Sequence, residues 1–174
     1  MTLPRGARLG IDVGKARVGL AISDPDGLVA TPVETVPRNL DAAENDSADL
    51  LRIAAVAEEF AVAIIYVGLP KHLSGLEGAA TADARSFATR LAAATPEIPI
   101  RLVDERLTTV SASSNLRAAG RKTKSHKSVI DQAAAIIILQ SALDSERHSN
   151  ARAGESVQTE ISLNPPTKAR NDRT

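Results

Sequence analysis

Hydrophobic residues alternate with polar residues or glycine through the first part of the chain, a spacing typical of β-strands. Residues 8–14 show this alternation, residues 17–24 make a second candidate strand, and residues 28–36 a third after the turn sequence Asp24-Pro25-Asp26-Gly27. Short segments joined by such turns pair with their neighbours along the chain. We therefore expect the chain to open with an antiparallel meander of three strands.

From about residue 41 the spacing changes to amphipathic helices that alternate with short apolar strands. A strand that follows a helix in this way returns parallel to the preceding strands. The sequence therefore predicts an α/β fold, with a mixed sheet of an antiparallel three-strand meander plus parallel strands and helices on both faces. The predicted helices are 41–60, 79–94, 108–119 and 129–143, and the predicted strands between them are 62–67 and 100–103.

The length and composition suit one globular domain with a tail. The chain has 174 residues, of which 43% are hydrophobic and 24% charged, as in ordinary soluble proteins. Periodicity is lost from about residue 145, where the sequence becomes polar and contains Asn164-Pro165-Pro166. We expect a flexible N-terminus over 1–7, one domain over 8–144 and a disordered tail over 145–174.

Charge and residue content exclude several classes of function. The 21 Lys and Arg balance 21 Asp and Glu, so any binding of a polyanion must come from a local patch. Without cysteine, disulfides, thiolate zinc sites and a cysteine nucleophile are excluded. Only three aromatic residues are present, too few for a domain that stacks single-stranded bases. No apolar run suits a membrane span or signal peptide, so we expect a cytoplasmic protein with no membrane association.

Three carboxylates lie in unusual surroundings. Asp12 stands in an apolar strand between two glycines, and Glu105 follows the end of another strand, where ligand sites of open α/β sheets gather. Asp131 opens the most apolar helix and lies towards its apolar side. Each has a structural alternative, namely an ion pair for Asp12, helix capping for the Asp104–Glu105 pair and a favourable position near the helix N-terminus for Asp131.

Convergence of the three carboxylates would require a cation, because like charges at short range disfavour joint ionisation. Oxygen ligands without histidine or cysteine select hard cations, so the cofactor would be Mg²⁺ or Mn²⁺. Two such ions about 3.5–4 Å apart activate a water and stabilise the leaving oxygen of a phosphodiester. The trio therefore predicts a site for two metal ions.

Four blocks of the sequence resemble the YqgF/RuvX family, RNase H-like nucleases described as Holliday junction resolvases and as pre-16S rRNA processing enzymes. The resemblance covers roughly residues 8–144. The blocks are GIDVGKARVGLA at 10–21, VGLP at 67–70 continuing to Glu77-Gly78, VDERLTT at 103–109 and SVIDQAAA at 128–135.

The resemblance implies an RNase H-like fold and a metal-dependent endonuclease. The active-site acids of the family fall on Asp12, Glu105 and Asp131, with Asp12 bridging both metals and the other two completing their ligation. Hydrolysis by in-line attack of water would leave 5′-phosphate and 3′-hydroxyl ends. The substrate would be a four-way DNA junction or pre-16S rRNA, between which the sequence does not choose. Symmetric cutting of a junction would require a homodimer at least when bound.

Basic residues beside the acids provide candidate phosphate contacts. Lys15 and Arg17 lie in and after the turn that follows Asp12. A second basic group occupies the loop that leads into Asp131 and contains no acid, so the cluster can hold phosphates beside the metals. Its candidate members are Arg121, Lys122, Lys124 and Lys127.

Two other functions fit parts of the sequence. An ATPase of the actin and sugar-kinase type also begins with an Asp-x-Gly strand hairpin like residues 10–22, but such proteins need two domains around the nucleotide. A binding module without chemistry would hold a junction or rRNA through the basic loop. It predicts that Asp12→Asn changes no activity, and it leaves the acidic trio without a role.

Overall fold

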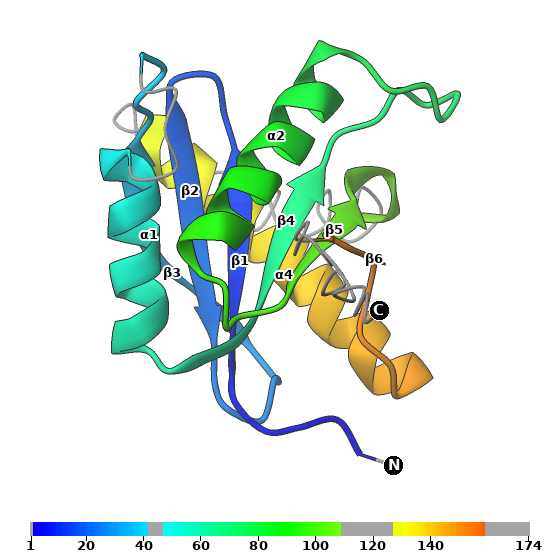
Figure 1. The fold of residues 1–174 in the computed structure, drawn as a ribbon. Helices are drawn as coiled ribbons and strands as arrows, with labels where there is room; N and C mark the ends of the chain where they lie inside the picture. Colours follow the sequence, from blue (N-terminus) through cyan, green and yellow to red (C-terminus); the bar gives the residue numbers. More distant parts are fainter. Residues whose placement is uncertain (1, 42–46, 109–126, 159–174) are drawn as a thin grey trace, which may run out of the picture.

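The computed structural model describes residues 2–41, 47–108 and 127–158 (Figure 1). Within them, six strands form one sheet in the order β3-β2-β1-β4-β5-β6. The strands are β1 (Ala7–Val13), β2 (Arg17–Ser23), β3 (Ala30–Pro37), β4 (Val62–Leu69), β5 (Ile100–Asp104) and β6 (Glu155–Ser156). The helices are α1 (Ala48–Glu59), α2 (Ala79–Ala94), the 3₁₀ turn η1 (Glu105–Thr108) and α4 (Lys127–Ser149).

The sheet topology confirms the predicted α/β fold. Strands β1, β2 and β3 form the antiparallel meander, and β4 and β5 lie parallel to β1. The turn between β2 and β3 is closed by Asp24, whose carboxylate accepts the backbone N–H groups of Asp26, Leu28 and Val29. Gly27 in this turn has a φ of +69°, which glycine adopts without strain.

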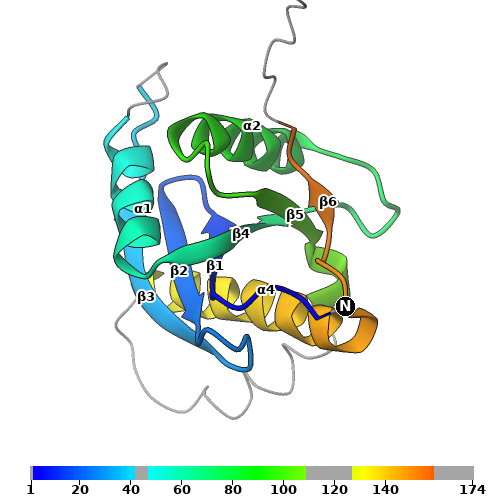
Figure 2. The ribbon, with the colours of Figure 1, turned by 60° about the horizontal axis from the view of Figure 1, so that its bottom comes forward.

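Helices cover both faces of the sheet, as predicted. Helices α1 and α2 lie side by side on one face, whereas α4 crosses the other (Figure 2). Because successive strand residues point to opposite faces, two apolar cores result. The larger core contains Leu9 and Ile11 of β1 under α1 and α2, and the smaller contains Tyr66 of β4 and Leu139 of α4. None of the described helices is long and apolar enough to cross a membrane.

The predicted helices agree with the structure to different degrees. The helix expected over 79–94 is α2, and the one expected over 129–143 is the core of the longer α4. The helix expected over 41–60 begins only at Ala48, after Ser47 as its N-cap residue. The helix expected over 108–119 lies outside the described residues, apart from its first position.

Regular structure continues beyond residue 144, so the boundary predicted there is wrong for residues 145–158. Helix α4 runs to Ser149, and β6 pairs with β5 in antiparallel register. The polar composition is misleading because one of its charges is internal: Glu146 is buried and accepts hydrogen bonds from Arg8, Arg152 and the Tyr66 hydroxyl. The predicted disorder of 159–174 lies outside the described residues.

Candidate active site

Two glycines allow α4 to approach the sheet closely. A Cβ atom on Gly10 of β1 would lie 2.5 Å from Cβ of Leu139, and a Cβ atom on Gly68 of β4 would lie 2.5 Å from Cδ1 of Ile138. Any larger side chain at either position would push the helix away. Helix α4 therefore packs directly against the backbones of β1 and β4.

Asp12 lies on the α4 side of the sheet, next to the carboxyl end of β1. It follows Gly10 by two residues, so its side chain points to the α4 side, and it is half-buried. Its antiparallel partner on β2 is Gly19, and the pairing of Ile11 with Val67 places it beside Gly68 on β4. The glycines on the two neighbouring strands place no side chain beside the carboxylate.

Glu105 reaches the same place from the other side of β4. It is the first residue of η1, directly after β5, and Val103 pairs with Gly68. A Cβ atom on Gly68 would lie 2.6 Å from Glu105 Oε1, so the carboxylate occupies the space above this glycine. The two acids thus meet across β4, on opposite sides of Gly68.

The electrostatics agree with this approach. Burial, then the negative charge of Asp12 and then that of Asp104 raise the pKa of Glu105 from 4.5 to about 7. A shift of this direction at strand ends is typical of functional sites rather than of surface carboxylates. The burial of Glu105 and its approach to Asp12 therefore fit the functional interpretation of this acid.

The neighbouring Asp104 points away from the site, as expected for one member of an adjacent pair. Its carboxylate accepts hydrogen bonds from the backbone N–H of Arg106 at 3.0 Å and from the guanidinium of the same residue. This partner lowers the pKa of Asp104. The structural interpretation of the acidic pair, capping at the start of a helical turn, thus holds for Asp104.

Asp131 is placed by its backbone only. It lies in α4 four residues, or about one helical turn, before Ala135, whose carbonyl oxygen lies next to Gly10. Its side chain is outside the described part of the structure, so its convergence with Asp12 and Glu105 stays a prediction. Among the described side chains, no group of three potential metal ligands occurs.

The structure likewise describes some of the predicted basic contacts and not others. Lys15 is exposed in the turn after β1, at the same end of the sheet as Asp12, and Arg17 begins β2. Lys127 is the first residue of α4, and its side chain is not described. Arg121, Lys122 and Lys124 lie outside the described residues, so the basic loop stays a prediction.

Sequence reasoning missed Arg38, which holds the turn that carries Lys15. Its guanidinium donates to the carbonyl oxygen of Gly14 at 3.0 Å and to Asp83 of α2, and it lies 5.5 Å from the centre of the Phe87 ring. Its backbone N–H donates to the Ala16 carbonyl oxygen. No sequence motif marks this residue, because its partners come from distant elements.

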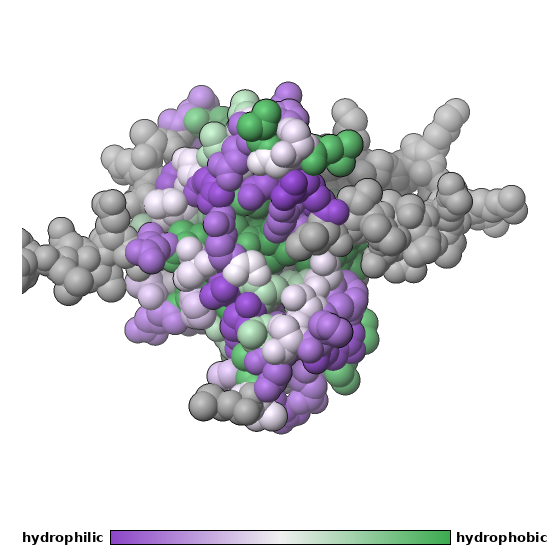
Figure 3. All heavy atoms as spheres, turned by 90° about the vertical axis from the view of Figure 1, so that its right-hand side faces the viewer, coloured by the Kyte–Doolittle hydropathy of each residue, from purple (hydrophilic) through white to green (hydrophobic). Residues whose placement is uncertain are grey.

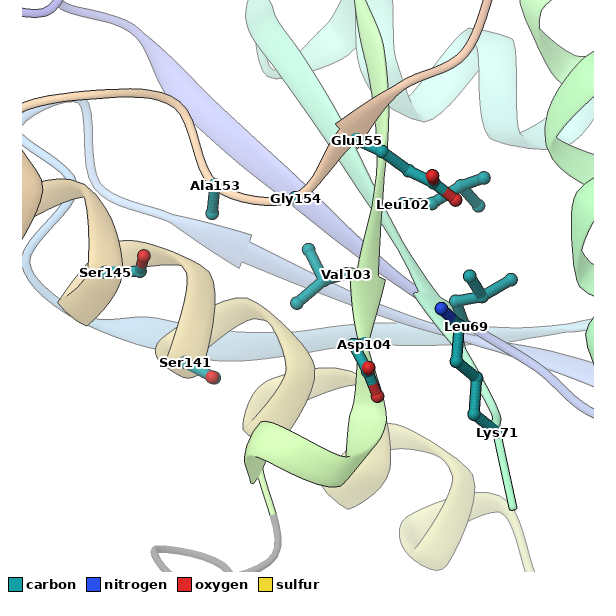
Figure 4. Close-up of a pocket in the computed structure, with 10 residues that line it drawn as sticks. All are labelled: Leu69, Lys71, Leu102, Val103, Asp104, Ser141, Ser145, Ala153, Gly154 and Glu155. Atoms are coloured by element: carbon teal, nitrogen blue, oxygen red, sulfur yellow. The ribbon is translucent and has the colours of Figure 1, made fainter. Parts of the chain in front are cut away.

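A pocket lies at the outer edge of β5, beyond the short β6. Figure 3 shows this side of the molecule, where hydrophobic atoms appear between an upper hydrophilic band and the lower part of the face. Figure 4 shows Asp104 and Lys71 at one end of the pocket and Ser145 and Ala153 at the other. Asp12 and Glu105 do not line it, so the pocket is distinct from the candidate active site.

The sheet order and the position of α4 define an RNase H-like protein, and solved structures share this fold. A structure described as "T. thermophilus RuvC in complex with Holliday junction substrate" superimposes with a TM-score of 0.57, covering 84% of this chain and 98% of that one at 17% identity. A second, "Thermus thermophilus RuvC structure", gives a TM-score of 0.56 at 16% identity.

The chain belongs to the RuvX family, described as "Holliday junction resolvase", whose family model matches residues 6–145. Relatives named "Putative pre-16S rRNA nuclease" include one from Clavibacter michiganensis subsp. michiganensis, 60% identical over 87% of this chain and 91% of its own length. Another, from Streptomyces avermitilis, is 51% identical over 92% of this chain and all of its own length. The resemblance recognised in the sequence is thereby confirmed.

Proposed function

We propose that this protein is a divalent-metal-dependent endonuclease that hydrolyses phosphodiesters of structured nucleic acid. The observation that carries the proposal is the meeting of Asp12 and Glu105 over Gly68, at the carboxyl ends of β1 and β5. Two half-buried carboxylates at this separation repel each other when both are ionised. Their arrangement is explained by a positively charged ligand between them.

The residues present fit Mg²⁺ or Mn²⁺. The donor atoms are carboxylate oxygens, which hard cations prefer, and the glycines at positions 19 and 68 place no side chain of β2 or β4 beside Asp12. Asp12 and Glu105 would hold two such ions together with Asp131, which the helix register places one turn beyond the residues packed on Gly10. When bound, the ions supply electrostatic stabilisation of the charge that develops on the phosphate oxygens.

The other residues of the site bind and orient the substrate. Lys15 and Arg17 lie beside the carboxyl end of β1 and would contact phosphates that flank the scissile bond. Lys127 and the basic loop with Arg121, Lys122 and Lys124 would extend this contact from the start of α4. The products would be a 5′-phosphate and a 3′-hydroxyl end, formed by in-line attack of water on phosphorus.

The substrate is a four-way DNA junction, pre-16S rRNA near its 5′ end, or both, and these substrates place the protein in the cytoplasm. The family description and the RuvC–junction complex support the junction, whereas the names of the relatives support the rRNA. A junction has two-fold symmetry, so its resolution needs two active sites and a homodimer on the substrate. Processing of one rRNA end does not require a dimer.

The experiment compares the parent protein, Asp12→Asn and the control Asp144→Asn, which replaces an exposed acid on α4. Each is incubated with Mg²⁺ or Mn²⁺ on a four-way DNA junction, a linear duplex and an RNA spanning the 5′ end of 16S rRNA. The proposal requires cleavage by the parent and the control but not by Asp12→Asn. Equal binding without cleavage by all three proteins would support a binding module instead, and tight ATP binding would support the ATPase alternative.

A further inference from the structure

Two leucines project from the loop between β4 and α2. Leu73 is 95% exposed and Leu76 is 69% exposed, the highest values among the large hydrophobic side chains that the structure describes. Two neighbouring leucines that contact little of their own protein indicate a surface for a partner.

The loop holds these side chains outward through its own backbone. The His72 N–H donates to the Leu76 carbonyl oxygen at 3.0 Å, and the Gly75 N–H donates to the His72 carbonyl oxygen at 2.8 Å. Gly75 adopts a φ of +86°, which permits the tight turn. The backbone of the loop is therefore internally bonded, so presenting the leucines to a partner requires little additional ordering.

The loop lies next to the candidate active site. It begins directly after β4, whose last residue Leu69 pairs with Asp104 on β5. A Cβ atom on Gly75 would lie 3.2 Å from the guanidinium of Arg106, the residue after Glu105. Figures 1 and 2 both show the loop beside η1. Nucleic acid bound at Asp12 and Glu105 would thus lie next to the loop that carries the two leucines.

Charges around the loop do not oppose this approach. The segment from Lys71 to Leu76 contains no acidic residue. Glu77 at its base is paired with Arg85 at 2.5 Å and lies 3.8 Å from Lys71. Asp104 is paired with Arg106 at 2.6 Å. Each of these carboxylates therefore has a cationic partner, which reduces its repulsion of a phosphate backbone.

We propose that Leu73 and Leu76 form an apolar wedge that inserts between stacked bases of the nucleic acid next to the scissile phosphate. The inference rests on the proposed nuclease function. It gives these two leucines the role of making the protein prefer branched or frayed nucleic acid. Apolar side chains inserted between base steps unstack them, and unstacking costs least where pairing is already interrupted. A leucine on each side of Gly75 presents the hydrophobic surface that this insertion needs.

The test measures unstacking without cleavage. The adenine analogue 2-aminopurine, whose fluorescence rises when it unstacks, is placed at the branch point of a four-way DNA junction and at the base of an RNA hairpin. The proteins are the parent, Leu73→Ser, Leu76→Ser, the double variant and the control Leu51→Ser, all with a chelator. Leu51 is 55% exposed on α1, away from the loop.

We expect fluorescence to rise with the parent and the control and to stay near the free value with the double variant, whose affinity falls more than about tenfold because two leucine side chains are no longer buried. The DNA and RNA arms show which nucleic acid the wedge enters. An equal rise with the double variant, or no rise with the parent on either substrate, would overturn the proposal. The proposal would also be overturned if the double variant were a monomer where the parent is a dimer, with the same fluorescence rise. The leucines would then form the contact between two copies of the chain.

Cleavage of the same substrates in Mg²⁺ separates this proposal from the nuclease function. If the parent cleaves without unstacking, the wedge is wrong and the nuclease assignment stands. If the parent unstacks without cleaving, the wedge stands and the nuclease assignment fails.

Discussion

Glu105 extends its carboxylate over Gly68, so closely that one methyl group at position 68 would lie 2.6 Å from its Oε1 atom. The relationship links two features of the local sequence, a glycine inside an apolar strand and an acid after the next strand, into one site. It also explains why β4 contains a glycine at a buried position where a branched residue would form a stronger strand.

Substitution of Gly68→Ala tests this relationship. The alanine methyl group would collide with Glu105 Oε1 and with Cδ1 of Ile138, and the half-buried glutamate can move aside more easily than the buried isoleucine. We expect the rate of cleavage to fall more than about tenfold, because a shift of about 1 Å in a catalytic group is costly. A double-mutant cycle with Glu105→Asp, which shortens the acid, gives the control. The double variant should be no worse than Glu105→Asp alone, and additive losses would contradict the contact.

The pKa of Glu105 predicts how stability varies with pH. The pKa is about 7 in the folded protein, against 4.5 for an unperturbed glutamate, so the folded state binds more protons between these values and its stability falls as pH rises. Glu105→Gln removes this loss. The variant should be about 2 kcal/mol more stable than the parent at pH 8, after allowance for partial exposure, and show no such gain at pH 4.

Urea unfolding with a chelator present measures this difference across the pH range. A gain in stability that is the same at pH 4 and pH 8 would show that ionisation of Glu105 does not destabilise the folded protein. Addition of Mg²⁺ should reduce the gain at pH 8, because a bound cation stabilises the ionised parent but not the glutamine variant.

The buried Glu146 predicts a large effect on stability far from the active site. It accepts hydrogen bonds from Arg8 at 3.0 Å and Arg152 at 2.7 Å. Glu146→Ala leaves the buried Arg8 without this carboxylate, which costs about 3–5 kcal/mol. The matched change Asp144→Ala, at an exposed ion pair two residues away, should cost less than about 0.5 kcal/mol. Chemical denaturation of both variants checks the prediction, and similar small losses would refute it.

The basic residues predict how binding depends on salt. Each lost phosphate contact lowers the slope of log affinity against log salt by about 0.9 on B-DNA. Lys15→Ala should show this change, and the double substitution of Lys124 and Lys127 by alanine should show about twice as much. Arg52→Ala, which removes an exposed arginine of α1 paired with Glu34, serves as the control. An unchanged slope for the lysine variants would remove those residues from the interface.

The local pattern predicted most of the fold because alternation and helical spacing are set by neighbours in the sequence. The meander, β4, α2 and β5 all follow from it. The sequence left the convergence of Asp12 and Glu105 open, and the structure brings these two acids close together. The boundary at residue 144 was wrong because Glu146 pairs with Arg8, a residue 138 positions away. Long-range ion pairs of this kind make a buried segment look like a polar tail.

The same limit applies to the residues that shape the site. The sequence shows Gly68 as a strand glycine, but only the three-dimensional structure shows that Glu105 lies over it. Arg38 was missed because its contacts to Gly14 and Asp83 join three separate elements. Asp131 was predicted from its helix, and its place in α4 agrees with that prediction, while its side chain lies outside the described part of the structure.

The metal site is tested most directly by a titration with Mn²⁺, followed by electron paramagnetic resonance, on the parent, Asp12→Asn, Asp131→Asn and the control Asp144→Asn. We expect the parent and the control to bind Mn²⁺ and to cleave a four-way junction or the rRNA substrate. Asp12→Asn and Asp131→Asn should lose both properties by more than about 100-fold, beyond the loss seen for outer-shell partners. Undiminished Mn²⁺ binding and cleavage by either variant would contradict the assignment of that acid to the metal site.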